Sequence, residues 1–298
     1  MRKLLYIINP ISGTHNKEPV RSIISSKTEA ANIPFEMYPS VADGDYSFLD
    51  SIITEGNFSD IIIAGGDGTV NQVINSLHKH DRPFGIIPCG SGNGLAFSAG
   101  LPKAVDKAFS IVFNGKPEFT DAFNVNGQFA CMLCGLGFDA QVAHDFANDR
   151  RRGLLTYIRK IIKNFFTCKT YSFSLESGNS QIHLNAYFIS IANSNQFGNN
   201  FTIAPRASLR DGLLDVVIMM RQSKLSVLLY TLKQITGFNK LQKIEMINDQ
   251  MSVVYFQAPS ITITNHELAP LHIDGEPKEN VSKLTIDLRA NFFRLIYP

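Results

Sequence analysis

Three short apolar runs early in the chain each end in a loop that contains glycine. The runs cover residues 4–8, 60–64 and 84–88, and the segments between them have the apolar spacing of helices. Strands that alternate with helices form a mostly parallel sheet, and the carboxyl ends of parallel strands share one edge. The three loops are therefore expected to meet, which constrains the fold of this part of the chain more than any other feature.

A second pattern begins near Thr120, where strand-like runs follow one another with few helices between them. The sequence therefore predicts an α/β domain over residues 1–120 and a mainly-β domain over residues 121–298, whose last strand can return toward the first domain. The other predicted strands are residues 35–38, 171–175, 183–192, 214–219, 253–257, 260–264, 284–288 and 292–296. The predicted helices are residues 18–32, 46–55, 70–80, 154–166 and 225–238.

The glycine-containing loops, residues 9–14, 65–69 and 90–94, indicate a site for a polyphosphate. Glycine lets backbone N–H groups approach phosphate oxygens, and a helix that starts just after a loop adds partial positive charge. Tight strand-to-helix turns are the alternative interpretation of each loop alone. The chain has neither a Walker A sequence nor G-x-G-x-x-G spacing, which argues against a P-loop enzyme and against a nicotinamide-dependent one.

Asp67 is the one carboxylate inside the second loop. A carboxylate beside phosphates becomes favourable when a hard cation such as Mg²⁺ lies between them. The alternative is a turn aspartate that hydrogen-bonds its own backbone.

Six motifs, in this order along the chain, resemble those of the diacylglycerol kinase catalytic-domain family. That family includes bacterial lipid kinases, sphingosine kinases and ceramide kinases, and it is distantly related to NAD kinases. The resemblance covers nearly the whole chain. The motifs are Asn9-Pro10-x-Ser12-Gly13, Gly65-Gly66-Asp67-Gly68-Thr69, Pro88-Cys89-Gly90-Ser91-Gly92-Asn93, Gly135-x-Gly137-Phe138-Asp139-Ala140, Ile203-Ala204-Pro205-x-Ala207 with Asp211-Gly212-x-Leu214-Asp215, and Asp274-Gly275-Glu276.

The resemblance implies an N-terminal Rossmann-like, NAD kinase-like α/β domain, a C-terminal β-sandwich-like domain, and an active site between them. It implies a phosphotransferase of lipid metabolism that moves the γ-phosphoryl group of ATP to a hydroxyl of diacylglycerol or a sphingoid-type lipid. By matching position, Asp211 with the backbone carbonyls of Ser208 and Leu213 would hold a structural Mg²⁺, and Asp121 would help organise the catalytic Mg²⁺. The residues expected at ATP are Asn9, Ser12, Gly13, Ser40, Gly65, Gly66, Asp67, Gly68, Thr69, Ser91 and Asn93.

Two carboxylates compete for the role of proton acceptor. Glu276 matches the general base of the bacterial family, although Asp274-Gly275 alone reads as a hairpin turn. Gly94 stands where bacterial diacylglycerol kinases usually carry a second acidic residue, and the run Gly-Ser-Gly-Asn looks more like the sphingosine and ceramide kinase branch. In that branch the aspartate of the second motif, here Asp67, is the candidate base. The lipid class and the choice between Glu276 and Asp67 stay open.

Residues 150–166 combine basic residues with apolar residues at helical spacing. Such a helix can lie on an anionic membrane, which predicts a cytoplasmic protein that is peripheral at the inner membrane surface. The alternative is an ordinary surface helix that packs its apolar face on the domain.

Net charge and the positions of the cysteines argue against further functional classes. The formal charge is +2, from 28 basic and 26 acidic residues, so no general attraction to nucleic acid is expected. Cys131 and Cys134 lie in an apolar run and are expected to be buried, unreactive thiols. A homodimer is compatible with the sequence. Two rival functions remain: a kinase for a soluble acceptor, as in NAD kinase, and a regulator that binds a nucleotide or lipid without catalysis.

Overall fold

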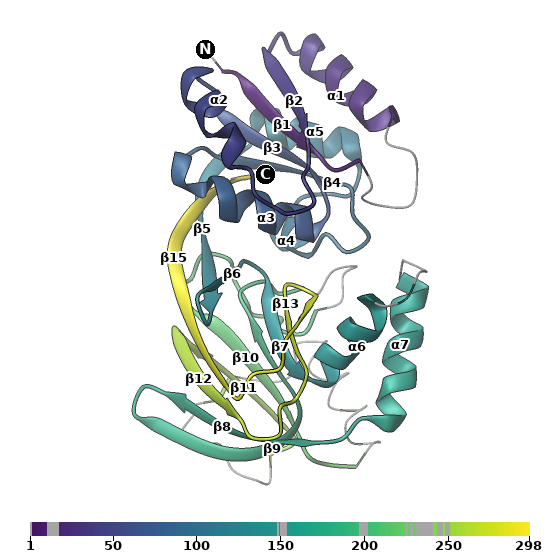
Figure 1. Cartoon of the computed structure of the whole chain (residues 1–298), viewed down its shortest axis with the longest axis vertical. Coiled ribbons are helices and arrows are strands. Elements are labelled where there is room, and N and C mark those ends of the chain that lie inside the picture. Colours follow the sequence, from purple (N-terminus) through teal and green to yellow (C-terminus); the bar gives the residue numbers. More distant parts are fainter. Residues whose placement is uncertain are drawn as a thin grey trace. The chain divides into compact units, whose positions relative to one another are not determined.

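The protein is described by a computed structural model, in which the chain folds into two compact units (Figure 1). Unit 1 comprises Met1–Thr120 and Asn291–Pro298, and unit 2 comprises Asp121–Ala290. Strands β5 (Lys116–Val125) and β15 (Lys283–Tyr297) carry the chain from one unit into the other. The structure describes residues 2–10, 18–147, 149, 154–196, 202–223, 226, 229, 241–242, 247 and 251–298. The helix predicted over residues 225–238 therefore lies outside the described residues except at positions 226 and 229.

Unit 1 is built on a parallel sheet in the strand order β15-β4-β3-β1-β2. Its strands are β1 (Leu4–Ile8), β2 (Phe35–Pro39), β3 (Asp60–Gly65), β4 (Phe84–Pro88) and the end of β15. Between them lie α1 (Glu18–Ala30), η1 (Ser47–Leu49), α2 (Asp50–Glu55), α3 (Asp67–Leu77), η2 (His78–His80), α4 (Gly94–Ser98) and α5 (Val105–Asn114). The predicted α/β class of this part is confirmed.

Both faces of this sheet are covered, because every residue of β1, β3 and β4 is buried. On one face Leu4 and Tyr6 pack with Ile24 of α1 and with Phe109 and its neighbours on α5. Helix α3 contacts β3 and contributes its own row of buried apolar residues. Continuous apolar strands are what a parallel sheet with helices on both faces requires.

Two predicted helices and two predicted strands differ in the structure. Helix α3 begins at Asp67, three residues earlier than predicted, because extended Gly66 ends the strand and the glycine at position 68 hides the helical pattern. The helix predicted over residues 46–55 is divided into η1 and α2. The strands predicted over residues 284–288 and 292–296 are the single strand β15, whose polar middle at residues 289–291 interrupts the apolar alternation.

Unit 2 is mainly antiparallel, as predicted, with the strand order β14-β13-β7-β9-β8-β12-β15. Strand β10 pairs with β9 and β11, and β5 pairs with β6. Its other strands are β6 (Gln128–Ala130), β7 (Leu133–Gly137), β8 (Tyr171–Ser177), β9 (Ser180–Ala192), β10 (Leu214–Met220), β11 (Val253–Ala258), β12 (Ser260–Asn265), β13 (Leu271–Ile273) and β14 (Glu276–Lys278). Among the described residues of this unit, the helices are α6 (Phe138–Ala147) and α7 (Leu154–Thr167).

The core of unit 2 comes from alternate residues of these strands, among them Phe173, Ile189, Val216, Ile263 and Ile286. Cys131 and Cys134 are buried, as predicted, and they form no disulfide. They do not share a strand, because the chain bends at Cys131 and Met132 between β6 and β7.

A two-residue turn, Asp274–Gly275, joins β13 to β14. Both residues have positive φ, 47° and 81°, which is the backbone of a type I′ hairpin turn and explains the Asp-Gly sequence. The Asp274 carboxylate is buried and accepts hydrogen bonds from the backbone N–H groups of Cys131, Met132 and Leu133 at 2.9, 3.0 and 2.9 Å. The turn before Glu276 is thereby attached to the bend between β6 and β7.

Asp274→Asn is expected to lower the free energy of unfolding by about 1–3 kcal/mol, because the amide NH₂ would face a buried backbone N–H in place of an acceptor. Chemical denaturation followed by circular dichroism measures the change. The control is Asp287→Asn on the exposed side of β15, which should change stability by less than about 0.5 kcal/mol. Equal denaturation midpoints for the two variants would contradict the anchoring role of Asp274.

Candidate active site

The loops that follow β1, β3 and β4 begin at the same edge of the unit 1 sheet. Backbone hydrogen bonds fix this alignment, with Asn9 N donating to Ala64 O at 3.0 Å and Cys89 N donating to Gly65 O at 2.9 Å. Ser40, at the end of β2, is tied to β1 in the same way. The expectation that the glycine-containing loops meet is therefore confirmed for their described residues.

The second and third loops touch through glycine backbone. A Cβ atom at Gly90 would lie 2.5 Å from Gly66 Cα, and a Cβ at Gly66 would lie 3.1 Å from Gly90 Cα. Any larger residue at Gly90 would have to push main chain apart. These two glycines are therefore required by close backbone approach.

Asn93 holds the third loop in shape. Its Oδ1 accepts a hydrogen bond from Gly90 N at 2.8 Å, and its Nδ2 donates to Gly90 O at 2.9 Å. The residue is buried and has φ 58°, a left-handed conformation that asparagine tolerates. Its side-chain amide is thus used within the loop, just before α4 begins at Gly94.

Asp67 lies in the first turn of α3, between the two loops. It is half-buried, and its Oδ1 accepts a hydrogen bond from Leu95 N at 3.4 Å. A Cβ at Gly92 would approach its Oδ2 to 2.8 Å, so the third loop passes close to this carboxylate. The second loop also contacts the first, because Asn9 Nδ2 donates to Thr69 Oγ1 at 2.7 Å.

The residues expected at ATP are accordingly gathered on one edge of the sheet, with two outside the described residues. Ser91 is exposed, whereas Thr69 is buried beside Asn9. Ser12 and Gly13 belong to the segment that the structure does not describe. The gathered residues are Asn9, Ser40, Gly65, Gly66, Asp67, Gly68, Thr69, Ser91 and Asn93.

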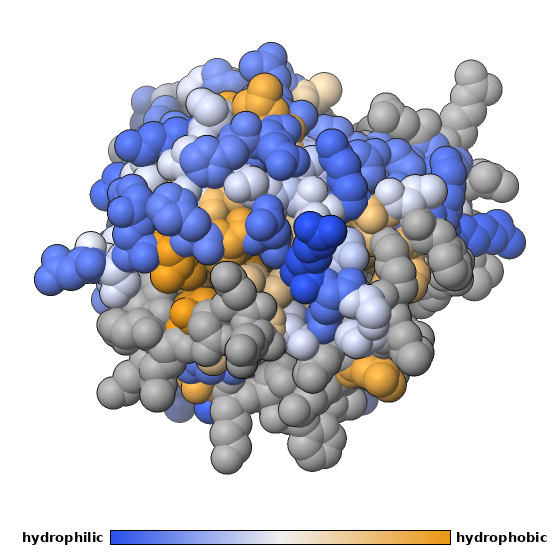
Figure 2. Space-filling view, turned by 90° about the horizontal axis from the view of Figure 1, so that it is seen from below, coloured by the Kyte–Doolittle hydropathy of each residue, from blue (hydrophilic) through white to orange (hydrophobic). Residues whose placement is uncertain are grey.

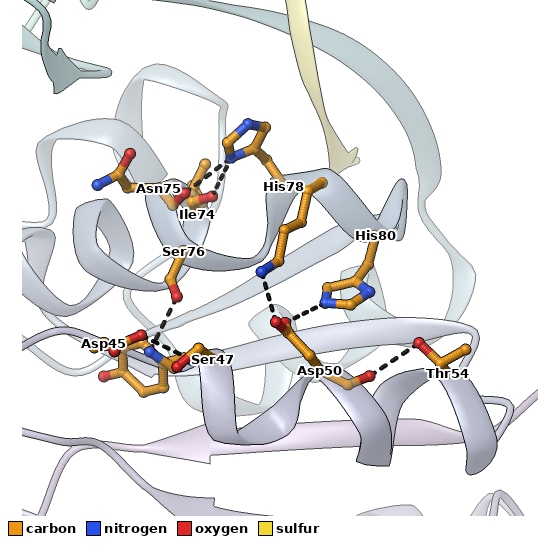
Figure 3. Close-up of polar contacts among 11 residues, drawn as sticks. Asp45, Ser47, Asp50, Thr54, Ile74, Asn75, Ser76, His78 and His80 are labelled. Atoms are coloured by element: carbon orange, nitrogen blue, oxygen red, sulfur yellow. Dashed lines mark hydrogen bonds and ion pairs between the residues drawn. The ribbon is translucent and has the colours of Figure 1, made fainter.

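The far end of the helix that carries Asp67 is also fixed (Figure 3). Asp50 of α2 accepts hydrogen bonds from Lys79 Nζ and His80 Nε2, both at 2.6 Å, and the Lys79 contact holds the pKa of Asp50 below its ordinary value. His78 stacks on Phe292 with ring centroids 4.3 Å apart. Two histidines without an evident role in the sequence thus fasten η2, which continues α3.

Of the residues expected around Mg²⁺, Ser208, Asp211 and Leu213 lie on the segment that leads into β10, and Asp121 lies on β5. Asp121 Oδ2 accepts a hydrogen bond from Gly212 N at 2.9 Å, and Asp121 N donates to Leu209 O at 2.7 Å. Asp211 Oδ1 accepts from Leu213 N at 3.2 Å. The structure therefore brings Asp121, Ser208, Asp211 and Leu213 into one region of unit 2.

The carboxylates here differ in how they are compensated. Partial desolvation raises the pKa of Asp211, and the charge of Asp121 adds to this. Burial also raises the pKa of Asp215, but this carboxylate has donors in the Tyr255 hydroxyl and in Gln257 Nε2. Within the described part of the chain, no group of three or more His, Cys, Asp or Glu side chains could hold a metal ion, so a site around Asp211 would need backbone carbonyls.

Glu276 is the exposed first residue of β14, directly after the Asp274–Gly275 turn. Sequence reasoning did not identify the residues that support this turn, namely Asp274, His272 and Asp139. The only signal for two of them was their place in motifs of the family. His272 is fully buried on β13, and no pattern in the sequence indicated its surroundings.

Comparison with known proteins matches both parts of the chain. Residues 3–125 match the family described as "Diacylglycerol kinase catalytic domain", and residues 133–295 match "YegS C-terminal NAD kinase beta sandwich-like domain". A "Diacylglycerol kinase" of Bacillus subtilis (strain 168) is 27% identical over 281 residues, covering 93% of this chain and 90% of the relative. "Probable lipid kinase YegS" of Shigella flexneri is 30% identical over 225 residues, covering 73% and 71%.

The fold agrees with that of a solved protein. A diacylglycerol kinase structure from Bacillus anthracis str. Sterne aligns with a TM-score of 0.74 over 100% of this chain and 97% of the other, at 19% sequence identity. The match to the YegS C-terminal domain family spans 163 of the 298 residues, which is more than half of the chain. The chain therefore belongs to the family that joins a diacylglycerol kinase catalytic domain to a YegS C-terminal domain, and it is a phosphotransferase with an alcohol group as acceptor.

Proposed function

We propose that this protein transfers the γ-phosphoryl group of ATP to a hydroxyl group of a lipid, either diacylglycerol or a sphingoid-type lipid. The observation that carries the proposal is the contact of the Gly66 and Gly90 loops beside Asp67, at the carboxyl edge of a parallel sheet. Ligands of open α/β sheets bind at this edge. The names of the relatives, diacylglycerol kinase and lipid kinase, support the choice of acceptor.

ATP fits the unit 1 loops for two reasons. Backbone N–H groups of glycine-containing loops can approach phosphate oxygens without side chains in the way. Helix α3, with 11 residues, begins at Asp67 within the second loop, so the positive end of its dipole lies at the same edge of the sheet. We assign the triphosphate to the residues gathered there, with Ser12 and Gly13 assigned on the resemblance alone.

The oxygen donors of the chain suit Mg²⁺, which prefers carboxylates, carbonyls and water. Asp211 with the carbonyls of Ser208 and Leu213 would hold a structural ion, and Asp121 would contribute to a catalytic one. Desolvation and, to a smaller extent, the charge of Asp121 raise the pKa of Asp211, and a cation beside these carboxylates would offset both effects, which supports the assignment. When bound, Mg²⁺ neutralises charge on the phosphoryl oxygens.

The reaction requires a proton acceptor. The acceptor oxygen forms a bond to the γ-phosphorus, the bond from that phosphorus to the β-bridging oxygen breaks, ADP leaves, and the hydroxyl proton passes to a carboxylate. Glu276 is accessible on its turn, and Asp67 is half-buried among the loops. We favour Glu276, with Asp67 as the alternative.

Glu276→Gln and Asp67→Asn are each expected to lower turnover more than tenfold, which corresponds to about 1.4 kcal/mol of transition-state stabilisation. The assay uses γ-labelled ATP, Mg²⁺ and a total lipid extract from the host, followed by separation of the lipids. Glu279→Gln is the matched control, because Glu279 is an exposed carboxylate three residues along the chain.

A labelled lipid that the control forms and Glu276→Gln does not would identify the acceptor. Full activity in one variant would remove that residue from the mechanism. ATP binding without any labelled lipid would instead favour a soluble acceptor, as in NAD kinase, or binding without catalysis.

The acceptor class depends on the region around Gly94. This residue is buried at the start of α4 and offers no carboxylate where bacterial diacylglycerol kinases usually have one. With glycine at position 94, Asp67 is the one acidic residue of the loops at 65–69 and 90–94. This feature supports a sphingoid-type lipid as acceptor, whereas the relatives' names support diacylglycerol.

Removal of a carboxylate provides a test of Mg²⁺ that does not use activity. Adding Mg²⁺ to the wild-type protein is expected to raise its melting temperature, because the ion binds only the folded state. Asp211→Asn should abolish this rise without lowering the melting temperature in the absence of Mg²⁺, since it removes a desolvated charge next to Asp121. Asp287→Asn, the exposed control, should keep the full rise. An Mg²⁺-dependent rise in Asp211→Asn equal to that of wild type would contradict the assignment.

Helix α7 supports peripheral contact with a membrane. Asn164 of α7 is buried, and its Nδ2 donates to Asp145 of α6 at 3.1 Å, while Lys160 pairs with Asp149 at 3.1 Å. Arg159 and Lys163 of α7 are exposed, so these two basic side chains are available to an anionic surface. In the parts of the chain that are described, none of the helices has the length and apolar character to cross a membrane.

Among the residues that Figure 2 colours, hydrophilic ones predominate and the apolar areas are separate from one another. Binding of the protein to a membrane would then depend strongly on the attraction between its basic residues and anionic lipids. Arg159→Glu with Lys163→Glu is expected to weaken binding to vesicles of phosphatidylcholine and phosphatidylglycerol at least tenfold, since each basic residue contributes about 1 kcal/mol at an anionic surface. Sedimentation with vesicles measures this. Lys103→Glu with Lys107→Glu, exposed in unit 1, is the control of equal charge change, and equal loss in both double variants would contradict a role of α7.

A further inference from the structure

A buried histidine and a buried aspartate lie beside the turn that presents Glu276. His272 on β13 is 1% exposed, and its Nε2 lies 3.5 Å from Oδ2 of Asp139, in the first turn of α6. The other oxygen of Asp139 accepts a hydrogen bond from Ala140 N at 2.8 Å. Among the described residues, Asp139 Oδ2 has no direct hydrogen-bond donor. The imidazole of His272 is the polar group that lies beside it and can compensate its negative charge.

Gly135 provides the space that this pair occupies. It lies opposite His272 in the β7–β13 ladder. A Cβ atom at Gly135 would overlap Asp139 Oδ2 and lie 2.6 Å from His272 Nε2. The first glycine and the aspartate of Gly135-x-Gly137-Phe138-Asp139 thus serve one arrangement, in which a strand without a side chain lets a carboxylate reach an imidazole.

The other imidazole nitrogen reaches the turn. Nδ1 of His272 accepts a hydrogen bond from Gly275 N at 3.3 Å, and Gly275 directly precedes Glu276. A neutral imidazole has one N–H donor and one acceptor, and the partner of one nitrogen decides the state of the other. An acceptor at Nδ1 requires the proton on Nε2, the nitrogen that faces Asp139. The Gly275 contact thus selects the tautomer, and the resulting Nε2–H faces Asp139 Oδ2 at 3.5 Å without a direct hydrogen bond.

We propose that Asp139 and His272 are positioning residues, which hold the backbone of Gly275 so that the carboxylate of Glu276 is oriented for its task. The inference rests on the proposed role of Glu276 as proton acceptor. It adds a second support to the turn, since Asp274 attaches the turn to residues 131–133 and His272 fixes the peptide next to Glu276. Groups that orient a functional side chain through its own backbone act on turnover more than on substrate binding.

Four variants test the proposal by steady-state kinetics. His272→Leu removes the acceptor for Gly275 N–H, whereas His272→Asn places an amide oxygen near the Nδ1 position. Asp139→Asn lets an amide donate to Nε2, which favours the tautomer that cannot accept from Gly275. His183→Asn on the exposed part of β9 is the matched control.

His272→Leu and Asp139→Asn are expected to lower kcat about tenfold or more, with the KM for ATP changed less than about twofold. His272→Asn should retain kcat within about threefold of wild type, which a merely structural role would not predict. Melting temperatures establish that each variant is folded. Unchanged kcat in folded His272→Leu would overturn the proposal.

A spectroscopic measurement separates this inference from the proposed function. In protein labelled with ¹⁵N in histidine and glycine, the ring of His272 should show an unprotonated Nδ1 and a protonated Nε2, and Asp139→Asn should reverse them and shift the Gly275 amide resonance. A protonated Nδ1 in the wild-type protein would overturn the inference. If Glu276→Gln were fully active while the tautomer was as expected, the role of Glu276 would fail, and with it the positioning role, although the hydrogen bonds would stand.

Discussion

Contact between the main chains at Gly66 and Gly90 is the constraint on which the site in unit 1 depends. The parallel register of β1, β3 and β4 delivers three loops to one edge, but only residues without a side chain let two of them touch. This contact brings the start of α3 next to the start of α4, and Asp67 then lies within reach of Leu95 N. The remaining side chains are fitted around that approach, since Asn93 shapes one loop and Asn9 supports the other.

Unit 2 shows two ways of placing a carboxylate in or near a protein interior. Asp274 and Asp215 are buried and receive several hydrogen bonds, so their charge is compensated by fixed donors. Asp121 and Asp211 are bonded to backbone N–H groups, yet desolvation and, in addition, the charge of Asp121 raise the pKa of Asp211. The first pair explains how loops and turns keep their shape. In the second pair the charge of Asp211 is less well compensated.

Much of the fold followed from the sequence because its signals are local. Continuous apolar runs identified β1, β3 and β4, and the family motifs located the loops that contain Asp67 and Gly90. The start of α3 was misplaced because glycines conceal helical periodicity, and β15 was divided because its polar middle interrupts the alternation.

The supporting residues of the site could not be predicted, because their contacts join positions far apart in the sequence. Asp274 meets residues 131–133, and His272 meets Asp139, across more than 130 positions in each case. Neither a spacing rule nor a composition reveals such a pair. Asp274-Gly275 did predict a hairpin turn, since that signal lies within two residues, but not the anchor that fixes it.

The division of β15 between the units has a consequence for the order of folding during synthesis. Residues Lys283–Ala290 complete strand pairs in unit 2, whereas Leu295 pairs with Phe84 at the edge of the unit 1 sheet. A ribosome therefore produces almost the whole of unit 2 before it produces the strand that completes unit 1. Until then, β4 exposes an unpaired edge in the nascent chain, a surface that invites pairing with other chains. Unit 1 comes first in the sequence, and yet it is the last to be finished.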